Sequence, residues 1–589
     1  MARAVLFGIP VSPGIAIGTV RFMHDMRQSE ERHIPSEEIP QEQIALRAAA
    51  AGVRTALAQT MRNVPEELAE YRDVIAAQME LARDPKLLNA ALARIERKGI
   101  CAAWALDLTI EELCELFRGM DDPYLRDRAQ DIRAVGLRIR ECLAGVLPRE
   151  ADKGPSLLVA EDLSPADVME LDLKGVLGIL TVEGGPTSHT AILSRGLRIP
   201  ALVGITGLLE TANENEPAIV DGLSGRVLLG PDAADLAHYT ARRDEYSRWV
   251  QQTRRNACWP AEMCDGVRVR AQANLESPDE LPGFAESGAD GVGLYRTEFA
   301  YLKGELPTEE ELFREYAAVV AKAAPQRVVF RTLDVGADKM LRSQASLKEP
   351  NPALGLRGIR FCLRHQGIFR TQLRALLRAG VAGNAALLLP MISGLGEVQS
   401  VRRILRELHE ELQAQNLAHA TGLPLGVMIE TPAAVLICDV LARECDFLSI
   451  GTNDLIHYLM AIDRNNRHVA YLNEPLHPAV MRSLKRIIDA GHREGIGVSV
   501  CGELAADPCG LAILLGMGVD AVSAAPCFVP GIKHMIRQLR ASTCQELAHS
   551  ILMSTDVQTC RHMVREKLHQ SLGPELAFHT TSLLGQSQP

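Results

Sequence analysis

Charged and reactive side chains follow short hydrophobic runs at five places in the second half of the chain. They are Arg296, Arg331, Glu430, the pair Asn453–Asp454, and Cys501. Arginine forks bind phosphate and carboxylate groups bidentately. A small number of carboxylates suits Mg²⁺, which keeps water and substrate oxygens in its shell. The set therefore predicts a site that binds a small, multiply charged, oxygen-rich anion together with Mg²⁺.

Cys501 differs from the other residues of this set because it carries a thiol. A thiol in a strand is more often a small core residue. At a strand end that faces a cationic, metal-bearing pocket, it could instead donate a proton. The position of Cys501 after the hydrophobic run GVSV favours the proton donor.

A second candidate centre is His189, in GGPTSHTAILSR (184–195). A lone histidine at a helix start is usually a capping or structural residue. Here two glycines permit close backbone approach, and three nearby hydroxyl groups, those of Thr187, Ser188 and Thr190, surround the histidine in sequence. Free N–H groups at a helix N-terminus stabilise negative charge. A neutral imidazole there is a good phosphoryl acceptor.

Composition and motifs exclude several other classes of protein. The net charge of −11 argues against a general nucleic-acid binder. No GxxxxGK[ST] loop, no metal-spaced Cys/His cluster and no run of about 18 apolar residues occurs. The 13 cysteines form no regular framework, which favours a reducing compartment. We therefore expect a cytoplasmic protein that has no membrane span and does not bind nucleic acid.

The elements that must position the first set of residues are eight strand-like runs, most of them separated by helical segments. The runs cover residues 267–274, 291–296, 327–334, 386–391, 425–430, 447–454, 497–503 and 520–526. Eight such units over about 270 residues predict a (β/α)₈ barrel, in which chemistry lies at the C-terminal ends of the strands. A doubly wound sheet is the structural alternative.

The rest of the chain predicts a multidomain α/β protein. Short apolar runs with Gly, Pro and Asp between them indicate an α/β domain, and apolar residues at three- and four-residue spacing indicate a helical hairpin or bundle. The expected parts are an α/β domain (1–22 and 146–230), an inserted helical subdomain (23–145), a linker helix (231–260), the barrel (261–541) and a C-terminal tail (542–589).

Several long motifs resemble those of one enzyme family. GGPTSHTAILSR is similar to the phosphohistidine signature of phosphoenolpyruvate-utilising enzymes, and DFLSIGTNDLIHYLMAIDR (446–464) is similar to their second signature. Further matches are YRTEF (295–299), FRTLDVGADK (330–339), NPALGLRGIR (351–360), RTQLRALLRA (370–379), NEPLHPAV (473–480) and VCGE (500–503). This combination resembles the Enzyme I family of the bacterial phosphoenolpyruvate:sugar phosphotransferase system, from residue 8 to about residue 533.

The resemblance implies roles for the residues of the barrel. Phosphoenolpyruvate and Mg²⁺ would bind there, and Cys501 would protonate the enolate carbon to give pyruvate. Glu430 and Asp454 would hold Mg²⁺. The phosphate and carboxylate groups would be clamped by Arg296, Arg331 and Arg464, with Asn453 beside them.

The resemblance also implies a relay through His189. The phosphorylated α/β domain would swivel and pass the phosphoryl group to a histidine of the small phosphocarrier protein HPr, docked on the helical subdomain. The barrel domain would form a homodimer. Departures from the family pattern are His457 in place of glutamine, Pro186 in place of a common arginine, and Ala337 in place of glycine.

Three alternatives to this function remain at the level of sequence. A paralogous, nitrogen-type regulatory phosphotransferase would feed a different HPr-like carrier, but usually has an N-terminal sensory domain. An ATP-dependent relative would need a large ATP-binding domain. A catalytically inert scaffold would not need the residues His189, Arg296, Glu430, Asp454 and Cys501.

Overall fold

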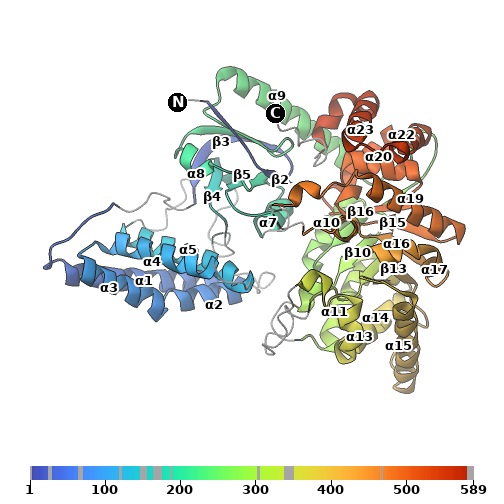
Figure 1. The fold of residues 1–589 in the computed structure, drawn as a ribbon, viewed down its shortest axis with the longest axis horizontal. Coiled ribbons are helices and arrows are strands. Elements are labelled where there is room, and N and C mark those ends of the chain that lie inside the picture. The colour runs from blue at the N-terminus through green and yellow to red at the C-terminus, as the bar shows by residue number, and fades with distance from the viewer. Residues whose placement is uncertain are drawn as a thin grey trace. The chain divides into compact units, whose positions relative to one another are not determined.

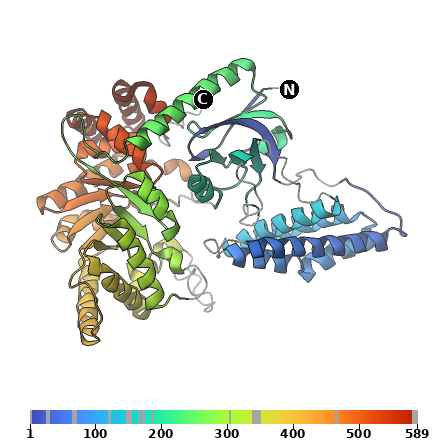
Figure 2. The ribbon, with the colours of Figure 1, turned by 180° about the vertical axis from the view of Figure 1, so that it is seen from behind.

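The computed structural model describes most of the chain as two compact units (Figures 1 and 2). The described residues are 3–23, 30–63, 71–118, 123–145, 155–163, 167, 175–185, 189–301, 306–336, 351–463, 466 and 468–579. Unit 1 is Met1–Tyr246 and unit 2 is Ser247–Pro589. The boundary between them falls within one long helix, α9 (Ala233–Arg255).

Unit 1 contains an antiparallel group of helices with its own hydrophobic core. The helices are α1 (Ile39–Asn63), α2 (Tyr71–Leu81), α3 (Pro85–Lys98), α4 (Ala102–Arg118) and α5 (Pro123–Leu143). The two ends of helix α3 show which residues begin and end a helix in this region. Asp84 accepts a hydrogen bond from the Lys86 amide, Pro85 occupies the first turn, and Gly99 ends the helix at φ 59°. The expected helical region is confirmed.

The other part of unit 1 is an eight-stranded mixed sheet in the order β1-β8-β7-β3-β4-β5-β6-β2. Its strands are β1 (Ala4–Phe7), β2 (Ile9–Ser12), β3 (Ile15–Phe22), β4 (Ser156–Ala160), β5 (Val176–Thr181), β6 (Ala201–Val203), β7 (Pro217–Asp221) and β8 (Arg226–Leu229). Strand β3 pairs in parallel with β4. The helices α1–α5 therefore connect two strands that are neighbours in the sheet. The short helices α7 (His189–Leu197) and α8 (Leu208–Thr211) complete this α/β part.

Unit 2 is built on a closed barrel of eight parallel strands in the order β10-β11-β12-β13-β14-β15-β16-β9. The strands are β9 (Arg270–Leu275), β10 (Val292–Arg296), β11 (Val328–Arg331), β12 (Ala385–Leu389), β13 (Leu425–Ile429), β14 (Phe447–Ile450), β15 (Gly497–Val500) and β16 (Ala521–Ala524). Each expected run contains or overlaps one of these strands. The predicted barrel is confirmed, and the doubly wound alternative is wrong because β9 and β16 pair and close the sheet.

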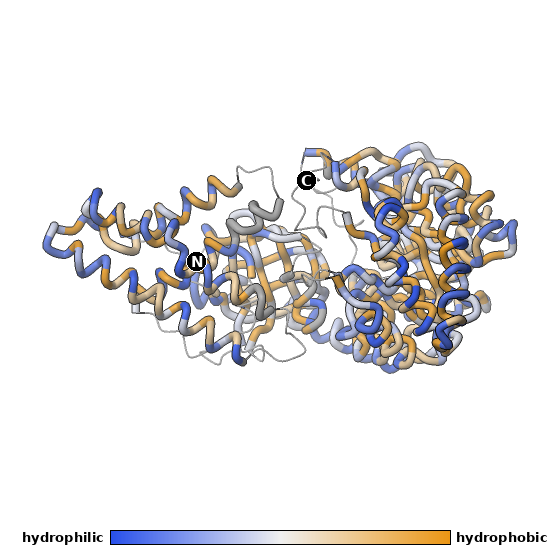
Figure 3. The backbone as a smooth tube through the Cα atoms, turned by 90° about the horizontal axis from the view of Figure 1, so that it is seen from below, coloured by the Kyte–Doolittle hydropathy of each residue, from blue (hydrophilic) through white to orange (hydrophobic). Residues whose placement is uncertain are grey.

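Helices surround this barrel. They include α10 (Leu281–Ser287), α11 (Glu309–Ala323), α13 (Ile359–Arg364), α14 (Gln366–Ala379), α15 (Leu395–Ala414), α16 (Pro432–Leu436), α17 (Cys438–Ala442), α18 (Thr452–Leu459), α19 (Pro478–Arg493), α20 (Pro508–Met517) and α21 (Val529–Gln538). Short 3-10 turns also contribute, among them η4 (Glu298–Tyr301) and η8 (Glu503–Ala505). Figure 3 shows hydrophobic residues along the strands and alternating polar and apolar turns in the helices.

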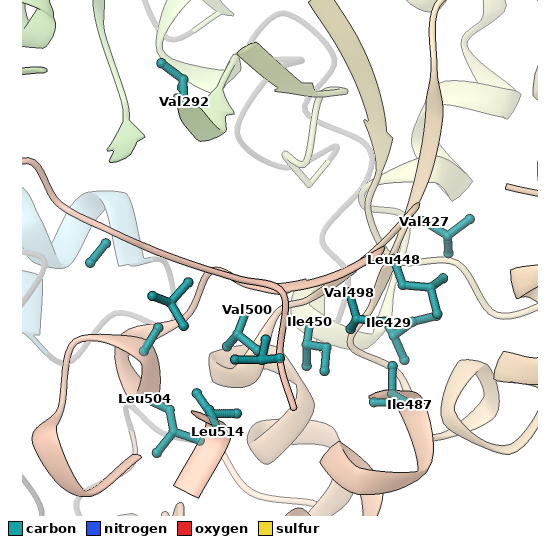
Figure 4. Close-up of a cluster of buried hydrophobic side chains, with 14 of the residues drawn as sticks. Val292, Val427, Ile429, Leu448, Ile450, Ile487, Val498, Val500, Leu504 and Leu514 are labelled. Atoms are coloured by element: carbon teal, nitrogen blue, oxygen red, sulfur yellow. The ribbon is translucent and has the colours of Figure 1, made fainter. Parts of the chain in front are cut away.

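Side chains on the barrel strands alternate between two hydrophobic layers. The outward-facing strand residues pack against side chains of the surrounding helices, such as Ile487 of α19 and Leu514 of α20 (Figure 4). The strand residues of this layer that Figure 4 labels include Val427 and Ile429 of β13, Leu448 and Ile450 of β14, and Val498 and Val500 of β15. The residues between them fill the barrel: Leu294, Val329, Ala386, Leu388, Met428, Phe447 and Cys501 form a separate buried cluster. This alternation decides which strand-end residues point inward.

The C-terminal segment differs from the expected tail. Residues after the barrel form α22 (Ala541–Met553), α23 (Val557–Leu572) and η9 (Gly573–Phe578). Their buried side chains, including Leu547, Ile551 and Val564, belong to the same hydrophobic core as the barrel helices. Residues 580–589 lie outside the described residues. Among the helices that the structure describes, none is long and apolar enough to cross a membrane.

One polar side chain in the helical core yields a stability prediction. Gln78 of α2 is fully buried, and neither its Nε2 nor its Oε1 has a hydrogen-bond partner among the described residues. A buried amide without partners carries its desolvation cost uncompensated. We expect Gln78→Met to raise the free energy of unfolding of unit 1 by about 1–3 kcal/mol, measured by urea denaturation.

The matched control is Gln43→Met. Gln43 of α1 is partly buried and donates to the Leu92 carbonyl oxygen at 3.5 Å, so its replacement should be neutral or slightly destabilising. Equal effects of the two substitutions, or a loss of stability in Gln78→Met, would contradict the prediction.

Candidate active site

Four of the predicted residues occupy inward-facing positions at the C-terminal ends of barrel strands. Arg296 is the last residue of β10 and Arg331 the last of β11. Glu430 directly follows β13, two residues after the interior Met428. Cys501 directly follows β15 and belongs to the interior cluster. Because residues two apart on a strand share a face, the same alternation that fills the barrel directs these side chains into its mouth.

Arg331 is the most enclosed cation of the mouth. Its Nη2 donates to Glu298 at 2.6 Å, and its Nη1 lies 3.1 Å from a carboxylate oxygen of Asp334. Burial opposes the guanidinium charge, but the carboxylates of Glu298 and Asp334 outweigh it and raise the pKa of Arg331. The side chain is therefore a fixed positive charge whose position is set by two carboxylates.

Arg357 is a second enclosed guanidinium that the analysis of strand ends did not identify. Its Nε and Nη2 donate to the two oxygens of Asp334 at 3.2 and 2.8 Å, and Nη2 also lies 3.3 Å from Asp454. Its Nη1 donates to the Tyr458 hydroxyl at 3.1 Å. Arg357 comes from the loop before α13, so strand ends could not reveal it. The signal in the sequence is the motif NPALGLRGIR, in which it lies.

Glu430 is a carboxyl group in a strongly desolvated position. Its side chain is 1% exposed, and its Oε1 accepts a hydrogen bond from the Met391 amide at 2.6 Å. Burial, followed by the negative charges of Asp454 and Asp334, raises the pKa of Glu430 to about 8. Gly451 leaves the space beside it open, because a Cβ atom there would lie 2.6 Å from Glu430 Oε2.

Among the described residues, carboxyl groups outnumber guanidinium groups at the mouth. Around Arg331 and Arg357 the described residues place the carboxyl groups of Glu298, Asp334, Glu430 and Asp454. No group of three or more His, Cys, Asp or Glu side chains in the described ranges is arranged to hold a metal ion. A metal at the Glu430–Asp454 pair would therefore take further oxygens from water and substrate, as Mg²⁺ commonly does. The negative charges of Asp454 and Asp334 act on Glu430 at this position, and a bound cation would offset their repulsion.

Asn453 and Asp454 lie in a helix instead of ending the sixth strand. Strand β14 ends at Ile450, and the chain turns at Gly451 into α18 (Thr452–Leu459). Asn453 exchanges two hydrogen bonds with Glu503, whose backbone amide donates to Asn453 Oδ1 at 3.1 Å. Asp454 reaches Arg357 from the first turn of the helix. The expected strand end is thus wrong by three to four residues, although Asp454 still joins the mouth.

Of the two other predicted arginines, the structure describes Arg296 and not Arg464. Arg296 pairs with Glu276, and its side chain is 39% exposed. Its Nε is buried without a hydrogen-bond partner among the described residues, so it can still donate to a ligand. Arg464 lies outside the described residues.

Cys501 is 5% exposed at the base of the mouth. The Ser449 hydroxyl donates to its Sγ at 3.5 Å, and Sγ lies 3.5 Å from the Ile450 carbonyl oxygen. Burial is the main cause that raises the pKa of the Cys501 thiol, and the charge of Glu430 adds to it. The sulfur therefore keeps its proton at neutral pH and can act as an acid.

His189 belongs to unit 1, where it is the first residue of α7. Gly184 before it has φ 108°, a conformation that glycine adopts readily. The Thr190 hydroxyl donates to Asp162 at 3.2 Å, so this hydroxyl is already engaged. Residues 186–188, including Thr187, Ser188 and the departure Pro186, lie outside the described residues, and so does Ala337. The departure His457 lies in α18 with its ring edge-on to Tyr458, at 4.9 Å between centroids.

Comparison with known protein families matches three regions of the chain to domains of PEP-utilising enzymes. Residues 250–541 match the PEP-binding domain of PEP-utilising enzymes. Residues 7–128 match the N-terminal domain of these enzymes, and residues 153–225 match their mobile domain. The matched mobile domain contains His189, and the matched PEP-binding domain contains the barrel.

Curated relatives are similar over nearly the whole chain. Phosphoenolpyruvate-protein phosphotransferases of Bacillus sp. (strain S) and Geobacillus stearothermophilus are each 39% identical over 555 residues, 93% of this chain and 95% of theirs. That of Priestia megaterium is 36% identical over 570 residues, 95% of this chain and 99% of its own. The chain therefore belongs to the Enzyme I family of PEP-utilising enzymes, the phosphoenolpyruvate-dependent protein phosphotransferases.

Proposed function

We propose that the chain moves the phosphoryl group of phosphoenolpyruvate to His189, releases pyruvate, and passes the group to a histidine of an HPr-like carrier. The observation that supports this most directly is the mouth of the barrel. It combines fixed guanidinium groups, a carboxylate pair and a protonated thiol at inward-facing positions. A substrate with a phosphate, a carboxylate and a carbon to be protonated uses all three.

We assign substrate binding to the arginines. Arg331 is held by Glu298 and Asp334 and offers a fixed positive charge, and Arg296 retains a buried donor. We assign these two residues, with Arg464, to the phosphate and carboxylate groups, and Asn453 to a neighbouring hydrogen bond. Arg357 binds Asp334 and Asp454 and acts as a positioning residue.

A metal ion is part of the chemistry of this family. We assign it as Mg²⁺, held by Glu430 and Asp454. When bound, it neutralises the charge of the phosphate and of the enolate that leaves. The raised pKa of Glu430 and the excess of carboxylates at the mouth support this assignment.

The transfer itself needs in-line positioning more than covalent chemistry from the barrel. The lone pair of a His189 ring nitrogen forms the N–P bond while the P–O bond to the enol oxygen breaks. The electrons of the broken bond remain on the enolate. Cys501 then gives its thiol proton to the methylene carbon, which yields pyruvate, and water reprotonates the sulfur. Its raised pKa keeps that proton available.

His189 begins a helix in a compact unit separate from the barrel. Free N–H groups at such a position stabilise the negative charge of a phosphohistidine. We propose that the α/β part of unit 1 swivels about its linkers, the linker helix (231–260) among them, between the barrel and the carrier, and that the carrier docks on α1–α5. We further propose a homodimer formed through the barrel domain and a cytoplasmic location. The working domains are residues 1–22 with 146–230, 23–145 and 261–541, and the described helices of 542–589 are assigned to the barrel domain because they share its hydrophobic core.

His189→Ala tests the relay. Incubation of the full-length protein with ³²P-phosphoenolpyruvate and MgCl₂ should give an acid-labile, base-stable label in the wild type and none in the variant, because the accepting nitrogen is gone. Adding candidate HPr-like carriers, including a nitrogen-type one, should move the label to the cognate carrier. Labelling that persists in His189→Ala would overturn the assignment.

Cys501→Ser tests the proton donor. We expect pyruvate formation to fall about 10²- to 10⁴-fold, because a hydroxyl is a much weaker acid than a thiol. Exchange of pyruvate methyl protons with D₂O, followed by NMR, should be lost as well. The control is Cys438→Ser, a buried thiol on α17 outside the mouth. Normal methyl exchange in Cys501→Ser would rule out this role.

Glu430→Gln tests the metal assignment. The amide keeps the size of the side chain and an oxygen acceptor for the Met391 amide, but loses the negative charge. We expect the MgCl₂ concentration needed for half-maximal labelling of His189 to rise at least tenfold. Glu494→Gln, which alters an exposed ion pair with Arg443, should leave that concentration unchanged. An unchanged requirement in Glu430→Gln would contradict the assignment.

A further inference from the structure

Two histidines outside the barrel mouth face each other with their ring nitrogens. His409 lies on α15, and His419 lies in the loop that leads from α15 to β13. His409 Nδ1 and His419 Nε2 are 2.9 Å apart, and the ring centroids are 4.7 Å apart at an interplanar angle of 70°. Both residues are partly exposed, so the pair is open to solutes.

The backbone after α15 builds this arrangement. Asn416 adopts φ 53°, and the Leu417 amide donates back to the Leu412 carbonyl oxygen at 3.0 Å, which reverses the chain at the helix end. The Ala420 amide then donates to the Leu377 carbonyl oxygen of α14 at 2.8 Å. Helices α14 and α15 pack side by side (Figure 1). The loop is therefore anchored on both sides of His419.

The hydrogen bonds also determine which tautomer a neutral His419 ring adopts. Its Nδ1 lies 2.7 Å from the Leu417 carbonyl oxygen, which can only accept. Nδ1 of His419 therefore carries the hydrogen, and the lone pair of the neutral ring lies on Nε2, directed at His409. A ring whose second nitrogen donates to a backbone carbonyl has the orientation and tautomer that metal-ligating histidines usually show.

We propose that His409 Nδ1 and His419 Nε2 bind a borderline divalent cation of the Zn²⁺ class. Two imidazole nitrogens on one tetrahedral Zn²⁺ lie about 3.4 Å apart, as follows from Zn–N bonds of about 2.0–2.1 Å. From the observed separation of 2.9 Å, the nitrogens must part by about half an ångström, and the rings must rotate so that both lone pairs point at the cation. A cation replaces the hydrogen bond between the rings, and the His409 proton moves through water from Nδ1 to Nε2, with no net release.

The ligand set decides which cation binds. Imidazole nitrogens favour Zn²⁺, Ni²⁺ and Cu²⁺ over Mg²⁺, which prefers oxygen. Since the described ranges contain no third His, Cys, Asp or Glu arranged with this pair, water completes the shell. The position in the last two turns of α15 also favours a cation, because the C-terminal end of a helix carries partial negative charge. The site is thus chemically distinct from the proposed Mg²⁺ site.

A cation at this pair would tie the helix to the loop that enters β13, the strand that Glu430 follows. Because both ligands must be in place together, binding favours the folded state of unit 2. The site would stabilise the barrel without taking part in phosphoryl transfer, so the inference does not depend on the proposed function.

Calorimetric titration of the reduced, full-length protein with ZnCl₂ in a buffer containing MgCl₂ tests the proposal. Wild-type protein should bind one equivalent that both His409→Gln and His419→Gln lose, because each ring supplies one of two ligands. The control His549→Gln removes an exposed histidine of α22 and should keep that equivalent. Pyruvate release with MgCl₂ alone should be equal in all four proteins. Retention of the equivalent in either single variant, or its loss in His549→Gln, would overturn the proposal.

A second measurement needs no variant and covers the case in which a substitution disturbs α15. Diethyl pyrocarbonate modifies accessible imidazole nitrogens, and peptide mass spectrometry reports each histidine separately. Added Zn²⁺ should slow modification of His409 and His419 at least fivefold and leave His549 unchanged. Equal rates with and without Zn²⁺ at both residues would count against the site.

Discussion

The charge balance around Arg331 is the constraint on which the barrel mouth depends. A guanidinium enclosed there must be neutralised, and Glu298 and Asp334 do so at 2.6 and 3.1 Å. The same carboxylate of Asp334 binds Arg357, which in turn reaches Asp454. Segments far apart in sequence are thereby fixed relative to one another by shared ion pairs. The remaining carboxyl, Glu430, has its pKa raised first by burial and then by the negative charges of Asp454 and Asp334, while the charge of Arg331 acts in the opposite direction.

Strand geometry explains how much of this arrangement could be predicted. The strand runs are visible in sequence because each is a short hydrophobic segment, and the period of two then decides which residues face inward. Arg296, Arg331, Glu430 and Cys501 all follow that rule. A closed barrel brings such positions together whatever their separation along the chain, so local patterns are enough to predict that they share one mouth.

Features that depend on turns and long-range packing could not be predicted in the same way. Asp454 was expected at a strand end, but β14 ends at Ile450, and the following Gly451 leaves room for Glu430, whose Oε2 would lie 2.6 Å from a Cβ atom there. Arg357 reaches the mouth from a loop whose course is set by Gly358 at φ 57°. The segment after residue 542 looked like a tail, since nothing local shows that Leu547 and Ile551 pack on the barrel helices. The contact between His409 and His419 likewise depends on a backbone reversal at Asn416.

The two proposed reactive groups need opposite environments. A thiol that must hold a proton at neutral pH benefits from burial, which raises its pKa, and Cys501 has this setting inside the barrel. A histidine that must carry a phosphoryl group needs N–H donors and access to a second protein, and His189 is the first residue of α7, a position at which a helix has free N–H groups. One pocket cannot be both closed to solvent and open to a carrier. The proposed mechanism therefore places the protonation of the enolate and the transfer to the carrier in two different compact units. The long helix α9 that joins them is then as much a part of the proposed mechanism as either reactive group.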